Sequence, residues 1–578
     1  MKWNALVALL LATGLIYAKK SADDVKKPKA GETEDVVVLF RVQPTEKHDN
    51  KGKSNGGRLK RKYNQLPAAA YSVSAKGLQD LEDDDDVLSI TPDRQVRGAT
   101  LGEALGAVHR WDIEPWYNAN GNCRGCTNNS PVGVAVIDSG VGAHADFNWW
   151  GTTTSRVVYS QSFVDSTTAD GYGHGTHVAG ILGSDGNIWC LQGGLTAAGD
   201  CRATQQFTGV APGVHIVSLK VLDSNGVGTD SAVIAAIDRA IQLKSTYNIR
   251  VMNLSLGRPV RESYKLDPLC QAVERAWNAG IVVVVAAGNE GRNNSVGTKG
   301  YGTITSPGND PLVITVGALY TGGNWWDADD RIATYSSKGP TAIDQIVKPD
   351  LVAPGNNIIA QQAAGSRLVT TYPANRPAVS SYWPWATGTS QYYFALNGTS
   401  MATPVVSGAA ALLIDKDRSL TPNQVKARLM KYARRGLART ASVYDAATAT
   451  TYSLTHDMFT VGAGVLNIGP AFYATDKPAG SSASPKAVYN SSTKKVSLNF
   501  AATGGTNVIW GEAATNPFST NVIWGENVIW GTNVIWGENV IWGTSSSAGG
   551  FNVIWGTTGQ IPGSPSATAL ALLANGDK

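Results

Sequence analysis

Residues 396–404 read LNGTSMATP, and the apolar run VVSGAAALL follows directly at residues 405–413. Gly398 permits a tight turn, so Ser400 is expected at the start of a helix. The free N–H groups and the dipole at that end of a helix favour negative charge, which suits a nucleophilic hydroxyl. Taken alone, the same run indicates only a turn or an N-cap serine. The remainder of the chain decides between these two interpretations.

From about residue 130 the sequence alternates between apolar strands and helices. Strands are predicted at residues 132–138, 215–222, 250–256, 281–287 and 312–319, and helices at residues 174–182, 230–243 and 269–279. Continuously apolar strands are typical of burial on both faces, so we expect an α/β fold with a mostly parallel sheet flanked by helices on both faces. Ligands of such sheets bind beyond the carboxyl ends of the strands, where Asp138, Ser255 and Asn289 fall.

Three short motifs stand at these predicted strand and helix ends. AVIDSGV places Asp138 at a strand end, GHGTHVAG places His174 at a helix start, and NGTSMATP carries Ser400. A serine hydroxyl needs a base, an imidazole titrates near neutral pH, and a carboxylate fixes the imidazole tautomer. These residue types therefore predict a nucleophile, a general base and an orienting acid.

In this order the three motifs resemble those of the subtilisin-like serine peptidases, and the likeness covers about residues 100–475. The resemblance implies a subtilisin-like fold, a triad of Asp138, His174 and Ser400, and hydrolysis of protein or peptide substrates through an acyl-enzyme. A related family of acid peptidases uses Glu and Asp in place of His, and His174 excludes it.

A fourth motif predicts an oxyanion site. The apolar strand IVVVVAA is followed by GNEG, which places Asn289 at the sheet edge. Its amide is expected to donate to the oxyanion together with the backbone N–H of Ser400. The alternative is that Asn289 is a turn residue, and the family resemblance favours the oxyanion role.

The resemblance also indicates two peptide-binding strands and a specificity cleft. Small residues there let a substrate backbone approach and add as a strand. The expected substrate-binding residues are Gly226, Val227, Gly228, Ser255, Leu256, Gly257, Ala286, Ala287 and Gly288. Because no acid is placed to demand a basic side chain, we expect broad specificity with an apolar or aromatic preference before the cut.

The N-terminal part predicts export and a pro-segment. Residues 1–18 begin with Lys2, continue with a short apolar run and end at Ala18, as in a secretory signal peptide; an uncleaved anchor is the alternative. Residues 19–98 predict strand, loop, strand, helix and strand, a small α+β unit. It resembles the family's inhibitory pro-domain, a partner of the catalytic domain, with cleavage near residues 97–101.

Composition adds limits on location and partners. The chain has 578 residues, a net charge of +4 and 63 glycines, which suits a loop-rich extracellular protein and indicates no nucleic-acid partner. In an exported protein the simplest arrangement of the five cysteines is two disulfides and one buried thiol. A zinc site or a thioredoxin-like role for the C-x-x-C is the less favoured alternative. We expect the pairs Cys123–Cys126 and Cys190–Cys201, with Cys270 as the thiol, although the sequence does not fix the connectivity.

The chain departs from the family pattern at two insertions, residues 185–207 and the aromatic residues 361–395. The chemistry requires no cofactor. Subtilases often bind structural calcium, and Asp146 lies near such a position with a spacing one residue short, so the metal site is left unassigned. His177 and His144 are expected to be structural.

After the expected peptidase domain at residues 99–476, residues 477–578 form a Ser/Thr/Gly/Ala-rich tail. The pentapeptide NVIWG occurs six times between residues 507 and 556, and four copies recur every six residues. An even period keeps each side chain on one face of an extended chain. The tail is either a β-prone low-complexity segment or a module for self-association or surface attachment.

Two functions from different classes follow. The first is a secreted serine endopeptidase made as a zymogen. The second is an adhesion protein whose peptidase domain is inactive and whose tail does the binding. The presence of Asp138, His174, Asn289 and Ser400 favours the first.

Overall fold

The computed structural model describes residues 20–22, 25–93, 95–98, 131–149, 152–186, 188, 207–295, 297–322, 329–381, 386–445, 450–490 and 495–504. The predicted signal peptide, both predicted disulfides and the NVIWG repeats lie outside these residues. Among the described residues, none of the helices combines the length and the apolar character that crossing a bilayer requires.

The chain divides into two compact units. Unit 1 comprises Met1–Arg94 with Leu266–Pro268, and unit 2 comprises Gln95–Lys265 with Leu269–Lys578. The first break falls four residues before residue 98, where the sequence placed the end of the pro-segment.

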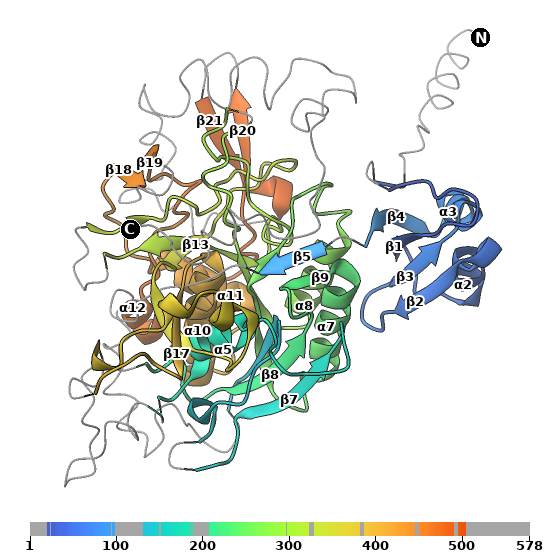
Figure 1. Cartoon of the computed structure of the whole chain (residues 1–578). Helices are drawn as coiled ribbons and strands as arrows, with labels where there is room; N and C mark the ends of the chain where they lie inside the picture. Colours follow the sequence, from blue (N-terminus) through green and yellow to red (C-terminus); the bar gives the residue numbers. More distant parts are fainter. Residues whose placement is uncertain are drawn as a thin grey trace. The chain divides into compact units, whose positions relative to one another are not determined.

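In its described residues, unit 1 is a four-stranded antiparallel sheet with two α-helices (Figure 1). Its strand order is β2-β3-β1-β4. The elements are β1 (Glu34–Phe40), α2 (Glu46–Gly52), β2 (Arg58–Lys62), β3 (Ala68–Val73), α3 (Ala75–Glu82) and β4 (Val87–Pro92). The core is formed by apolar side chains of β1, β3, α3 and β4, including Val36, Tyr71 and Leu81. The sequence predicted β1, β3, α3 and β4. It took residues 51–62, which contain β2, as a polar insert, and it did not predict α2.

The main sheet of unit 2 is mixed, with the order β14-β13-β12-β10-β6-β8-β7 and β15 beside β13. All its pairs are parallel except β13 with β14. The strands are β6 (Gly133–Asp138), β7 (Val157–Ser162), β8 (His215–Lys220), β10 (Ile249–Leu254), β12 (Val282–Ala286), β13 (Ile314–Tyr320), β14 (Arg331–Ile332) and β15 (Leu351–Pro354). Each predicted strand of this sheet is present with ends within two residues of the prediction.

Helices cover this sheet. The helix α10 packs against β10, β12, β13 and α5, whereas α7 packs against β6 and β8. The helices are α5 (His174–Gly183), α7 (Asp230–Gln242), α8 (Pro268–Asn278), α9 (Arg367–Thr371), α10 (Thr399–Lys416), α11 (Pro422–Lys431) and α12 (Ile468–Tyr473). The strands β6 and β10 are adjacent, so their carboxyl ends, at Asp138 and Ser255, meet at one edge.

Smaller sheets complete unit 2. One has the order β11-β5-β9, and three hairpins pair β16 with β17, β18 with β19, and β20 with β21. Their bounds are β5 (Gln95–Gly98), β9 (Val227–Thr229), β11 (Leu256–Gly257), β16 (Ile358–Gln361), β17 (Tyr393–Leu396), β18 (Thr440–Asp445), β19 (Thr450–Thr455), β20 (Lys486–Asn490) and β21 (Lys495–Asn499). The residues before β20 are packed into unit 2: Ser484 is buried and its hydroxyl contacts Asp350. Packing therefore continues beyond residue 476.

Candidate active site

A buried carboxylate and an imidazole meet at the carboxyl end of β6. Asp138 is the last residue of β6 and His174 is the first residue of α5, and neither is exposed to solvent. The Nδ1 atom of His174 lies 2.7 Å from Oδ1 of Asp138. The same oxygen accepts the backbone N–H of Ser139 at 2.7 Å. A proton held on Nδ1 by the carboxylate leaves Nε2 as the basic nitrogen of the ring.

Ser400 stands in the first turn of α10, as the sequence predicted from its position after Gly398. Gly398 is the N-cap and has φ of +151°, a conformation that favours glycine. The hydroxyl of Ser400 donates to the backbone carbonyl of Ser255 at 3.0 Å. In return the hydroxyl of Ser255 donates to the carbonyl of Ser400 at 2.5 Å. These two bonds tie the start of α10 to the end of β10.

Asn289 lies three residues beyond β12, and its side chain is fixed against the start of α10. Its Oδ1 accepts the backbone N–H of Thr399 at 2.9 Å and the hydroxyl of Thr399 at 3.1 Å. Residues 286–288 lead to it: the carbonyl of Ala287 accepts the N–H of Thr305, and Gly288 has φ of +106°. Because the side-chain oxygen of Asn289 accepts hydrogen bonds from the start of α10, the orientation of its side-chain NH2 group is fixed.

The two predicted peptide-binding segments flank one strand. Val227 and Gly228 lie on β9, and Leu256 and Gly257 form β11, and β5 lies between these strands, antiparallel to both. Figure 1 shows β5 alongside β9. The chain's own residues 95–98 thus occupy the strand position that the sequence assigned to a peptide.

Residues that the sequence did not single out hold the start of α5. Asp170 is buried, and its Oδ1 accepts the N–H of Gly173 at 2.7 Å and the hydroxyl of Ser139 at 2.8 Å. Its Oδ2 accepts the N–H and the hydroxyl of Thr176 at 2.8 and 2.6 Å. Burial raises the pKa of Asp170 despite these donors. The carboxylate caps the helix that begins with His174.

The other histidines near the site have structural contacts. His177, one turn along α5, is fully buried and its Nε2 lies 3.0 Å from the carbonyl oxygen of Phe394. Burial holds its pKa well below the usual range. His144 bonds the carbonyl of Tyr392, and burial lowers its pKa as well. Cys270 is buried on α8, where its thiol contacts the side-chain oxygen of Asn309, as expected for a structural thiol.

The surroundings of Asp146 do not fit a calcium ligand. Its Oδ2 accepts the side-chain N–H of Gln361 at 2.7 Å and the hydroxyl of Tyr393 at 2.9 Å. Its Oδ1 accepts the backbone N–H of Ile188 at 2.6 Å. Hydrogen-bond donors on both oxygens take the place that a cation would need.

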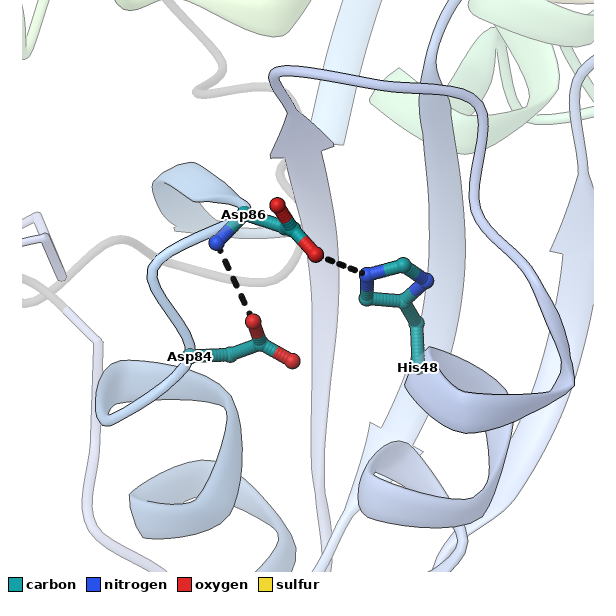
Figure 2. A group of neighbouring side chains, drawn as sticks. All are labelled: His48, Asp84 and Asp86. Atoms are coloured by element: carbon teal, nitrogen blue, oxygen red, sulfur yellow. Dashed lines mark hydrogen bonds and ion pairs between the residues drawn. The ribbon is translucent and has the colours of Figure 1, made fainter.

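A second group of metal-ligand side chains occurs in unit 1, where His48, Asp84 and Asp86 place ligand atoms within 4.8 Å of one another (Figure 2). Lysines already neutralise both carboxylates. Lys51 lies 2.8 Å from Asp84, and Lys47 lies 3.2 Å from Asp86. The Nε2 atom of His48 is bonded to Asp86 at 3.1 Å. The group is an ion-pair network that ties α2 to the turn before β4.

Comparison with known proteins agrees with this geometry. The family model described as the subtilase family matches residues 129–464. The chain is 32% identical over 382 residues to serine protease AprX of Bacillus subtilis, covering 65% of this chain and 76% of that protein. It is 35% identical over 305 residues to subtilisin DY of Bacillus licheniformis, covering 52% and 83%. It is 30% identical over 434 residues to subtilisin E of Bacillus subtilis, covering 74% and 91%.

The matched region contains both the buried carboxylate–imidazole pair and the serine at the start of α10. The chain therefore belongs to the subtilase family and is a serine-type endopeptidase.

Proposed function

We propose that the chain is a secreted endopeptidase made as a zymogen, in which Asp138, His174 and Ser400 form the catalytic triad. The observation that carries the triad is the 2.7 Å contact between His174 and Asp138 at the edge where Ser400 is tied to β10. A peptide added between β9 and β11 would run past this edge.

In the proposed reaction the hydroxyl oxygen of Ser400 attacks the substrate carbonyl carbon, and its proton passes to Nε2 of His174. The Asn289 amide and the backbone N–H of Ser400 stabilise the resulting oxyanion. The proton then moves to the leaving amine as the C–N bond breaks, which leaves an acyl-enzyme. Water attacks the ester, gives one proton to His174, and the regenerated Ser400 hydroxyl receives that proton.

Covalent labelling with a fluorophosphonate tests this assignment. The processed protein should label at one serine, and Ser400→Ala should abolish labelling. Ser419→Ala is the matched control, because Ser419 is exposed beyond the end of α10. Labelling that survives Ser400→Ala would overturn the assignment of the nucleophile.

The zymogen proposal rests on β5. The register pairs Gly98 with Leu256, and a substrate in this register presents its next residue opposite Ser255, whose carbonyl accepts the Ser400 hydroxyl. The same count along the chain supports the bond between Ala99 and Thr100 as the proposed processing site, within the range predicted from the sequence. Residues 19–98 would then be the pro-domain.

N-terminal sequencing of the secreted protein tests this register. The mature chain should begin at Thr100, and Ser400→Ala should remain uncut. A mature chain beginning several residues away would contradict the register. A protein without residues 19–98 should refold poorly.

We expect the cleft that residues 255–257 and 286–288 would line to favour an apolar or aromatic residue before the cut, since all six residues are uncharged. A peptide library that shows a strict preference for Lys or Arg would contradict this proposal.

For the tail, we propose self-association or surface attachment. Deletion of residues 505–560 that leaves solubility and cell association unchanged would exclude that role.

A further inference from the structure

The segment between β16 and β17, residues 362–392, is called here the β16–β17 insertion. We propose that the insertion positions the ring of Tyr172, which forms one side of a substrate-binding subsite. This subsite receives the substrate residue immediately N-terminal to the residue that acylates Ser400, and it selects glycine or another small residue. This inference rests on the proposed function, and it assigns a specificity-determining role to the insertion.

The insertion is bonded to the loop that precedes His174. In α9, the backbone N–H of Arg367 donates to the carbonyl of Gly171, and the N–H of Leu368 donates to the carbonyl of Tyr172, both at 3.0 Å. Leu368 is 1% exposed, so α9 is seated and does not simply extend into solvent. A Cβ atom on Gly173 would lie 2.3 Å from the hydroxyl oxygen of Ser366. The insertion therefore fixes the backbone on which Tyr172 stands.

The ring of Tyr172 fills the space between the catalytic imidazole and the turn before β9. Its centroid lies 6.3 Å from that of the His174 ring. A Cβ atom built on Gly226 would lie 2.5 Å from Cζ of Tyr172, so the ring lies directly against this glycine. Tyr172 is only 3% exposed. Burial raises its pKa, so the phenol stays neutral in the working pH range.

A second contact joins the insertion to the other side of this ring. The guanidinium of Arg367 donates to the side-chain oxygen of Asn225, the residue before Gly226. The turn that contains Asn225 is itself fixed by Asp223, whose Oδ1 accepts the N–H groups of Asn225 and Val227 at 2.8 and 3.0 Å. The insertion thus holds both the loop that carries Tyr172 and the turn against which its ring packs.

The register of β5 shows which substrate residue meets this wall. Val96 is opposite Gly228 and Arg97 is opposite Val227. One further step of the antiparallel ladder would set Gly98 opposite Gly226, the residue before β9. Gly98 is also the residue before the one that would face Ser255. In this register the chain's own Gly98 would stand at the position next to Tyr172, where a larger side chain would meet the ring.

Processed enzyme and internally quenched peptides that differ only at this position test the inference. With glycine or alanine, kcat/KM should exceed the value with leucine or phenylalanine by about tenfold or more, since a fixed wall excludes added side-chain carbons. Tyr172→Ala should raise kcat/KM for the leucine and phenylalanine peptides relative to the glycine peptide. Arg367→Ala should do so in part, because it frees the turn at Asn225.

The matched control is Arg418→Ala, which also removes an arginine but one that lies beyond the C-terminal end of α10 and pairs with Asp415, and it should keep the wild-type profile. If Tyr172→Ala does not fold, Arg367→Ala alone decides the outcome. An enzyme that labels with fluorophosphonate but shows no preference at this position would overturn this inference and leave the proposed function intact. A preference that both Tyr172→Ala and Arg367→Ala retain would do the same. A protein that neither labels nor cleaves any peptide contradicts the proposed function instead.

Discussion

The side-chain oxygen of Asn289 accepts two hydrogen bonds from Thr399, one from the backbone N–H and one from the hydroxyl. Thr399 precedes Ser400 and also receives the N–H of Gly288 on its hydroxyl oxygen, at 3.2 Å. The proposed oxyanion donor and the proposed nucleophile are therefore positioned by one residue. A donor fixed before the reaction needs no reorganisation when charge develops.

Replacement of Asn289 tests that arrangement. Asn289→Ala removes the amide donor, and kcat should fall by about 10²- to 10³-fold with little change in KM, because the donor acts on charge that develops in the transition state. Thr399→Val keeps the backbone bond and removes the hydroxyl, so its loss in kcat should be smaller. Steady-state kinetics on one peptide substrate measure both. A raised KM with unchanged kcat in Asn289→Ala would contradict the oxyanion role.

Asp170 gives the second prediction. Because an amide cannot accept at its nitrogen, Asp170→Asn should place an N–H group against the donors of Gly173 or Thr176 and displace the start of α5. A shift of this kind in a catalytic group costs up to about 100-fold in kcat. A merely structural role would lower the yield of folded protein but leave kcat per fluorophosphonate-labelled site unchanged. Asp165→Asn is the control, because this acid is more exposed and pairs with Lys220 instead.

The pH profile of activity gives the third prediction. His174 must be neutral to accept the serine proton, so kcat/KM should fall as the pH drops, with a slope of one on a logarithmic plot. Burial lowers the pKa of both His177 and His144, so neither should add a second proton to this limb. His144→Gln should leave the midpoint of the limb in place. A slope of two, or a midpoint that moves in His144→Gln, would contradict the assignment of a single base.

The sequence alone predicted the strands and the residues at their ends because the signals were local. The buried runs ending at Asp138 and before Asn289 are continuously apolar, and glycine-containing motifs mark the helix starts at His174 and Ser400. The strand β2 was missed because its residues, RLKRK, alternate only between exposed and half-buried positions, and Leu59 is the single apolar residue that packs against the core. Helix α2 was missed for a similar reason, since its sequence EKHDNKG is entirely polar.

The supporting residues of the site could not be predicted in the same way. Asp170 accepts a hydrogen bond from the hydroxyl of Ser139, which is 31 residues away in the chain. Thr399 donates its backbone N–H to Asn289, which is 110 residues away. Only the fold brings these groups together. The one local signal was an acid, Asp170, shortly before the predicted helix start at His174, since negative charge is favoured near a helix N-terminus. Likewise, nothing in QVRG, the sequence of β5, indicates that it pairs on both sides.

The last prediction concerns the stability of unit 2. Lys426 on α11 is fully buried, and its amine lies 3.1 Å from Asp350 and donates to the carbonyl of Pro311 and the hydroxyl of Ser484, both at 2.9 Å. Asp350 is also paired with Lys348 at 2.7 Å. Burial alone would raise the pKa of Asp350, but the two lysines hold it below its usual value.

Burial lowers the pKa of Lys426 to about 7, so the amine is charged below that pH. There Lys426→Met should lower the free energy of unfolding by about 3–5 kcal/mol, because it leaves a buried carboxylate with only one cation. Lys431→Met on the same helix removes a half-exposed pair with Asp476 and should cost less than about 1 kcal/mol. Urea unfolding in a Ser400→Ala background, which prevents self-digestion, measures both.

The depressed pKa of Asp350 stabilises the fold above the ordinary carboxyl pKa, and this stability is lost as the pH falls through the folded-state value. Removing one lysine raises that value, so acid unfolding of Lys426→Met should begin at a higher pH than in the Lys431→Met control. Equal acid midpoints would show that Lys426 contributes packing and hydrogen bonds but no stabilising charge.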